Sequence, residues 1–123
     1  MASSVGFHEN EAILAPATKD RHRALASLQE ELEAIDWYDQ RVDAAEDADL
    51  KAILAHNRDE EREHAMMVLE WLRRNAPGFE EQMRTYLFKD GPILGLEAAA
   101  TNGGGEPAPA AGGDGSLGIG SLR

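Results

Sequence analysis

The sequence predicts an all-α protein: an antiparallel two-helix hairpin followed by a short third helix. Two long segments carry apolar residues at alternating spacings of three and four, which is the spacing of one face of an α-helix. A short acidic connection joins them, and no segment shows the strict alternation of a half-buried strand. Because a hairpin is half of a four-helix bundle, we expect dimerisation to complete the bundle.

The first long helix is expected to begin near Thr18, a residue type that caps helices, and to end near Ala45. Residues 1–17 precede it and are expected to form a flexible N-terminus. Its apolar stripe, which Asp39 interrupts at one turn, consists of Leu25, Leu28, Leu32, Ile35 and Val42.

The second long helix follows the sequence "EDAD", with Asp47 or Asp49 as its cap, and is expected to end near Asn75, ahead of a Pro-Gly pair. Its stripe is unusual because two ionisable residues, Glu61 and His64, lie among the apolar ones. The members of the stripe are Leu50, Ile53, Leu54, Asn57, Glu61, His64, Val68, Trp71 and Leu72.

A third, shorter helix is expected at residues 79–88, and "DGP" at 90–92 should end it. The helical domain is therefore placed at residues 18–95. Residues 96–115 are rich in Gly, Pro and Ala and read as a linker. Residues 116–123, "SLGIGSLR", alternate small and apolar residues, which suits an extended peptide that docks into a partner.

The charge balance narrows the possible partners. The 123 residues include 12 Lys plus Arg and 23 Asp plus Glu, for a net charge of -11. This balance argues against nucleic acid and against anionic membranes as partners, and it favours cations. The chain has no cysteine, no apolar run long enough to span a bilayer and no secretory signal pattern, which together fit a reducing cytosol.

The short connection brings Glu31 and Glu61 to the same height in the hairpin. The turn centres near residue 46, so the two glutamates lie fifteen residues before and after it. At 1.5 Å per residue, both are roughly 22 Å from the turn. His64 follows Glu61 by one helical turn, so we expect the three side chains to converge.

Two carboxylates and an imidazole suit iron or manganese and can also hold zinc. A bound cation would remove the cost of burying the carboxylates. Glu-x-x-His alone is weak evidence, and its position in an apolar stripe strengthens it. The alternatives are a core His64 hydrogen-bonded to Glu61, or both residues pairing across an interface.

The number of ligands predicts how many chains the site requires. A di-iron carboxylate site in a four-helix bundle takes one Glu from each of two helices and one Glu-x-x-His from each of the other two. One chain supplies half of that set, Glu31 with Glu61 and His64. We therefore expect a homodimer with the metals at its interface.

Three segments of the chain resemble the encapsulated ferritins, which are two-helix half-ferritins carried as cargo inside encapsulin nanocompartments. They are residues 21–44, "RHRALASLQEELEAIDWYDQRVDA", residues 53–75, "ILAHNRDEEREHAMMVLEWLRRN", and residues 84–88, "RTYLF". The resemblance covers roughly residues 18–92. It implies a ferritin-like bundle and a ferroxidase, which oxidises Fe(II) to Fe(III) with O2 at a di-iron centre.

The resemblance also implies roles for individual residues. Glu31, Glu61 and His64 would be the iron ligands and Tyr38 the tyrosine of the iron centre. Two further glutamates would form a secondary, metal-attracting site, although a solvated acidic face is the plainer reading; they are Glu30 and Glu33.

The resemblance further implies a ring of five dimers, which is a decamer. Residues 116–123 look like a peptide that loads cargo into an encapsulin shell. The protein would then be cytoplasmic, inside an encapsulin nanocompartment where the iron is stored. Two other functions stay open: a non-catalytic helical cargo adaptor, and a di-iron or di-manganese enzyme that reduces peroxide. An adaptor would favour Leu or Ala at positions 31, 61 and 64.

Overall fold

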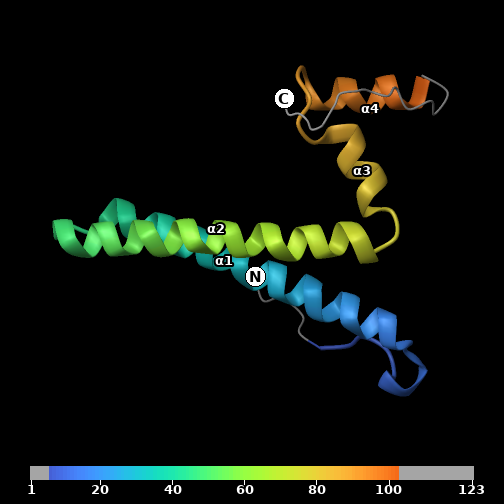
Figure 1. The fold of residues 1–123 in the computed structure, drawn as a ribbon, viewed down its shortest axis with the longest axis horizontal. Helices are drawn as coiled ribbons and strands as arrows, with labels where there is room; N and C mark the ends of the chain where they lie inside the picture. The colour runs from blue at the N-terminus through green and yellow to red at the C-terminus, as the bar shows by residue number, and fades with distance from the viewer. Residues whose placement is uncertain (1–5, 103–123) are drawn as a thin grey trace. The chain divides into compact units, whose positions relative to one another are not determined.

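The computed structural model describes residues 6–102, and over these residues the fold is all-helical without a strand, as predicted (Figure 1). Residues 1–5 and 103–123 lie outside the described residues, and with them most of the expected linker and the whole peptide 116–123. The elements in chain order are the 3₁₀ helix η1 (Glu11–Ile13) and the α-helices α1 (Pro16–Ala44), α2 (Ala48–Asn75), α3 (Phe79–Tyr86) and α4 (Ile93–Asn102).

Helices α1 and α2 form the predicted antiparallel hairpin, with residues 45–47 as the connection (Figure 1). Asp47 is the N-cap of α2, and its carboxylate accepts a hydrogen bond of 2.9 Å from the backbone N–H of Leu50. This bond satisfies one of the N–H groups that a helix leaves unpaired in its first turn. Of the two candidate caps, the structure therefore selects Asp47 over Asp49.

The start of α1 differs from the expectation that Thr18 would cap it. The helix begins at Pro16, with Ala15 at the cap position and no side-chain cap bond. Proline suits the first helical position because its fixed φ matches the helix and its missing N–H would have been unpaired there. Thr18 lies inside the first turns, where its hydroxyl accepts a hydrogen bond of 3.1 Å from Arg21 Nη2.

Residues 6–15 are attached to α1, although the sequence predicted no structure before residue 18. Asn10 caps η1 by accepting a 2.9 Å hydrogen bond from the backbone N–H of Ala12. Lys19 Nζ of α1 lies 3.6 Å from a Glu11 carboxylate oxygen, and the rings of Phe7 and His22 have centroids 4.9 Å apart. These contacts are local, and no apolar periodicity in the sequence predicts them.

The chain divides into two units, one ending at Phe79 and one beginning at Glu80. In the second unit, α4 extends the helical region past residue 95, into the segment expected to be linker. The carbonyl of Pro92 accepts bonds from the N–H groups of Gly95 (3.0 Å) and Leu96 (3.2 Å), which starts the helix. The alanines that follow are strong helix formers, and they outweigh the glycine at position 95.

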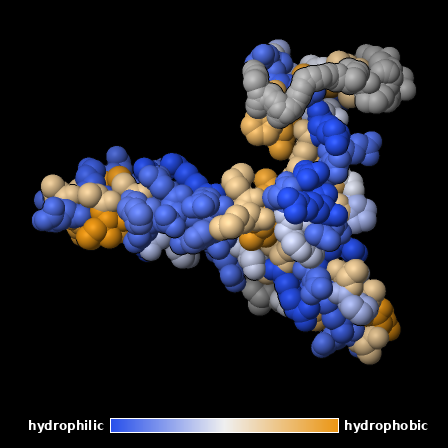
Figure 2. Space-filling view, viewed as in Figure 1, coloured by the Kyte–Doolittle hydropathy of each residue, from blue (hydrophilic) through white to orange (hydrophobic). Residues whose placement is uncertain are grey.

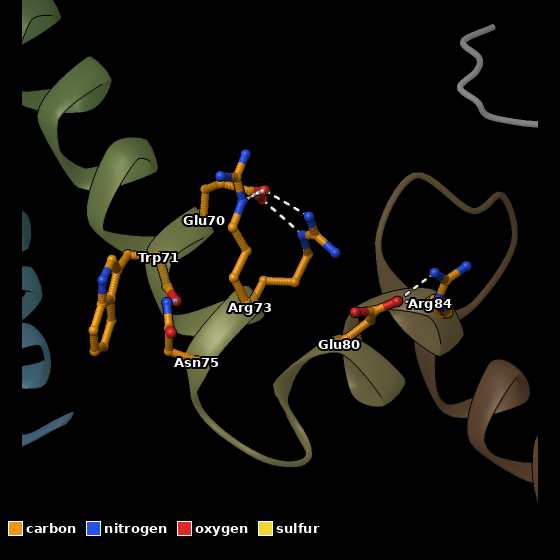
Figure 3. Close-up of polar contacts among 7 residues, drawn as sticks. Glu70, Trp71, Arg73, Asn75, Glu80 and Arg84 are labelled. Carbon is orange, nitrogen blue, oxygen red and sulfur yellow. Dashed lines mark hydrogen bonds and ion pairs between the residues drawn. The ribbon is translucent and has the colours of Figure 1, made fainter. Parts of the chain in front are cut away.

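Arginine–glutamate pairs form within the last turns of α2 and within α3 (Figure 3). Arg73 and Arg74 both donate to the carboxylate of Glu70, with nitrogen–oxygen distances from 2.6 to 2.8 Å. They lower the pKa of Glu70 to about 2. Within α3, Arg84 bonds to Glu80 one turn earlier. Such exposed pairs within one helix contribute little to stability.

The hairpin has a small core. Among the described residues, only Ala65, Leu72 and Ala76 are buried hydrophobic residues. Several large apolar side chains of α1 and α2 remain between 48% and 58% exposed: Leu32, Trp37, Leu50, Ile53, Met66 and Met67. Figure 2 shows hydrophobic residues at the surface among hydrophilic ones on one face. Across residues 6–102, no helix is long and apolar enough to cross a bilayer.

Candidate metal centre

The structure brings Glu31 of α1 together with Glu61 and His64 of α2. Each offers one ligand atom, and these atoms lie within 4.8 Å of one another. His64 Nδ1 is 3.3 Å from Glu61 Oε1 and 3.7 Å from Glu31 Oε1. Among the described residues, Glu31, Glu61 and His64 are the one group of three acidic or histidine side chains close enough together to hold a metal ion.

The antiparallel register of the hairpin produces this convergence. Because the connection at 45–47 is short, Glu31 of α1 and Glu61 of α2 lie at the same distance from the turn. The spacing of three between Glu61 and His64 puts both on one side of α2. Their side chains are 24% and 42% exposed, and that of Glu31 is 26% exposed. The group is therefore partly shielded, while water and dissolved ions still reach it.

The two carboxylates interact unfavourably when both are charged. The pKa of Glu31 is raised, first because its carboxyl shares a hydrogen bond with Glu61, then because of burial and the negative charge of Glu61. His64 acts in the opposite direction. A proton shared between the carboxyls relieves the repulsion, and a divalent cation bound between them would relieve it more completely.

The donors fit iron chemically. Carboxylate oxygen and imidazole nitrogen are the ligands that iron and manganese use in helical bundles, and three of them face a common point here. Three donors from one chain leave positions open on an octahedral ion. The site can therefore accept ligands from elsewhere, including water or a second copy of the chain.

The other three predicted site residues lie outside this group. Tyr38 is two turns along α1 from Glu31, and the guanidinium carbon of Arg41 lies 5.6 Å from the centre of its ring. Glu30 and Glu33 are exposed on α1. Glu33 borders an open depression of about 380 Å³, and the other residues that line it are Leu25, Leu28, Gln29, Leu32 and Asp36.

Glu60 also lies near the group, a position that the sequence did not predict. Its Oε1 lies 3.8 Å from His64 Nε2, whereas Glu31 and Glu61 lie near the other ring nitrogen, Nδ1. The available signal was the spacing of four from His64, which places the two residues on adjacent turns. That signal is weak, because most glutamates at such positions only face water.

Comparisons with known proteins agree on one family. A family model described as EncFtn-like matches residues 6–90. The chain is 60% identical over 126 residues to the "Encapsulated ferritin-like protein" of Rhodospirillum rubrum, covering 98% of this chain and 90% of that protein. It is 45% identical over 51 residues to the "Encapsulin nanocompartment cargo protein EncC" of Myxococcus xanthus, covering 42% and 39%.

A solved structure shares the fold. The chain resembles the crystal structure of protein ne0167 from Nitrosomonas europaea with a TM-score of 0.69 and 57% identity. The match covers 72% of this chain and 97% of that one.

Replacing Glu31 by Gln should stabilise the metal-free protein at neutral pH. The raised pKa means that the folded state holds the proton more tightly than the unfolded chain, so stability falls as pH rises from 4.5 through that pKa. Glu31→Gln keeps a hydrogen-bond donor but removes the charge. We expect a gain of about 0.5 kcal/mol in unfolding free energy at pH 7 with chelator, the size typical of a partly exposed charge pair, and no gain well below pH 4.5.

Urea unfolding at the two pH values measures this difference. The matched control is Glu33→Gln, which removes an exposed charge from the same helix and should change stability little at either pH. A Glu31→Gln variant that is less stable than the wild type at pH 7 would contradict the repulsion between Glu31 and Glu61.

Proposed function

Since the chain belongs to the EncFtn-like family, we propose that it is a ferroxidase that oxidises Fe(II) to Fe(III) with O2 at a di-iron centre formed between two subunits. Iron oxidised there would be stored inside an encapsulin nanocompartment. The observation that carries the proposal is the convergence of Glu31, Glu61 and His64 within 4.8 Å. Two carboxylates this close repel each other when both are charged, and a bound cation would remove that repulsion.

Two features of the hairpin support a site shared between two chains. One chain supplies one Glu and one Glu-x-x-His, half of what a di-iron centre in a four-helix bundle takes. The large apolar side chains that stay about half exposed give a second copy a surface to cover. Metal binding and dimerisation are then linked, because an ion that binds the dimer better than the monomer stabilises the dimer.

In this proposal Fe(II) is the substrate, and the ligands tune its reactivity. When two Fe(II) ions are bound, each gives up one electron, and O2 takes up both electrons and two protons to become hydrogen peroxide. Glu31 and Glu61 hold the ions through hard oxygen donors, which favour the ferric product. His64 adds a nitrogen donor through Nδ1, the atom that faces both carboxylates. Partial exposure of the group lets iron enter and leave.

Three further residues have proposed roles on α1. Tyr38 would serve as the tyrosine near the iron centre, two turns from Glu31. Glu30 and Glu33 are exposed and carry negative charge, so they would attract Fe(II) toward the centre.

The names of two relatives support a place inside a shell. One is called an encapsulated ferritin-like protein and the other an encapsulin nanocompartment cargo protein. We propose that this chain is likewise encapsulin cargo in the cytoplasm, assembled as a ring of dimers. Residues 116–123 would dock on the shell protein, with the segment before them as the tether.

The variant His64→Ala should lose at least about 10-fold in the rate of O2-dependent Fe(II) oxidation, because it removes one of three ligands. Its helix content should stay unchanged, since alanine favours helix. The measurement is the appearance of Fe(III) absorbance under air, with circular dichroism in parallel. His22→Ala, on α1 and away from the group, is the control.

A wild-type rate in His64→Ala would remove His64 from the site and contradict the proposal. Oxidation that needs added hydrogen peroxide and does not proceed with O2 would instead favour the peroxide-reducing enzyme.

Deleting residues 116–123 should abolish packaging and leave Fe(II) oxidation intact, because the peptide is far along the chain from the ligands. Co-expression with an encapsulin shell protein and purification of the shell measure packaging. Deleting residues 103–110, an equally long part of the expected linker, is the matched control and should retain it. Packaging of the chain without residues 116–123 would place the docking signal elsewhere.

A further inference from the structure

Glu60 lies between two histidines of α2. Its Oε1 is 3.8 Å from His64 Nε2 and its Oε2 is 3.9 Å from His56 Nε2. The three residues are spaced by four, so they form one row along the helix. The side chain of Glu60 is 48% exposed, and each of its oxygens faces a different imidazole.

The ring of His64 therefore presents its two nitrogens to two different groups. Nδ1 faces Glu61 and Glu31, at 3.3 and 3.7 Å, and Nε2 faces Glu60. A neutral imidazole has one nitrogen with a lone pair and one with a proton. If Nδ1 binds a metal ion, the proton must be on Nε2, and the acceptor that faces it is the Glu60 carboxylate.

We propose that Glu60 is a positioning residue for the metal centre: it accepts the Nε2–H of His64 and so fixes the ring with Nδ1 toward Glu31 and Glu61. This role rests on the proposed function. A carboxylate that accepts from a metal-bound histidine holds the ring orientation and makes the imidazole a better donor. The distance of 3.8 Å between Glu60 Oε1 and His64 Nε2 is longer than a hydrogen bond. Because Glu60 is half-exposed, rotation about its side-chain torsions can bring the two atoms into hydrogen-bond distance.

The geometry favours positioning over a second role as a ligand. The ligand atoms that share one point are those of Glu31, Glu61 and His64. Glu60 lies beside Nε2 of the His64 ring, whereas Glu61 and Glu31 lie beside Nδ1, the nitrogen assigned to the metal. The other oxygen of Glu60, Oε2, lies 3.9 Å from His56 Nε2, and Glu60 is not among the residues whose ligand atoms share one point.

The test compares two substitutions of Glu60 in the full-length chain. Glu60→Ala removes the acceptor, and we expect it to weaken Co(II) binding by about 10- to 100-fold. Glu60→Gln keeps an acceptor oxygen without the charge, and we expect its loss to stay within about 3-fold. Glu63→Ala removes an exposed charge from the same helix and should leave the affinity unchanged.

Titration followed by the visible absorption of bound Co(II) gives affinity, stoichiometry and coordination geometry without depending on oxidation. Rescue by Glu60→Gln separates a hydrogen bond from simple attraction between charges. Equal losses in Glu60→Ala and Glu60→Gln, or no loss in either, would overturn the positioning role. A drop in the number of ions bound would make Glu60 a ligand and would also overturn it.

His64→Ala in the same titration distinguishes failure of this inference from failure of the proposed function. If His64→Ala binds Co(II) as tightly as the wild type, no metal centre exists at this group, and both proposals fail. If His64→Ala loses binding while Glu60→Ala keeps it, only the role of Glu60 is overturned.

Discussion

Repulsion between two carboxylates is the constraint from which the rest of this structure can be understood. Glu31 and Glu61 come from different helices, and the pKa of Glu31 is raised, first by a hydrogen bond with Glu61 and then by burial and by the negative charge of Glu61. A helical hairpin would be more stable with an apolar pair at these positions, as their neighbours along the stripes are. The free-energy cost of placing two carboxylates together is offset if a cation occupies the site, because both carboxylates then bind the cation.

Assembly of two chains depends on the same site. A two-helix hairpin is too thin to bury its own apolar stripes, and only Ala65, Leu72 and Ala76 are buried among the described hydrophobic residues. A second copy would cover apolar surface and add the missing ligands in one event. In our proposal this couples iron, dimer and activity, so a free chain would have neither a complete core nor a complete centre.

The sequence predicted the hairpin and the convergence of three residues because both follow from periodicity. Stripe spacing and a short connection fix which residues face each other and at what height. It did not predict η1 or α4, since local bonds such as those of Asn10 and Pro92 start them, nor the start of α1, which Pro16 sets without a cap bond. The sequence did not predict the position of Glu60 either. Whether a glutamate one turn before a histidine faces that histidine or only water depends on the orientation of the histidine ring, which the sequence does not encode.

Crystals of the full chain soaked in ferrous salt, with anomalous diffraction recorded at the iron edge, test the central claim most directly. The account predicts two iron sites between two chains, each ion near Glu31, Glu61 and His64 side chains drawn from both. Iron bound wholly within one chain, or at the exposed glutamates with none at this group, would contradict it.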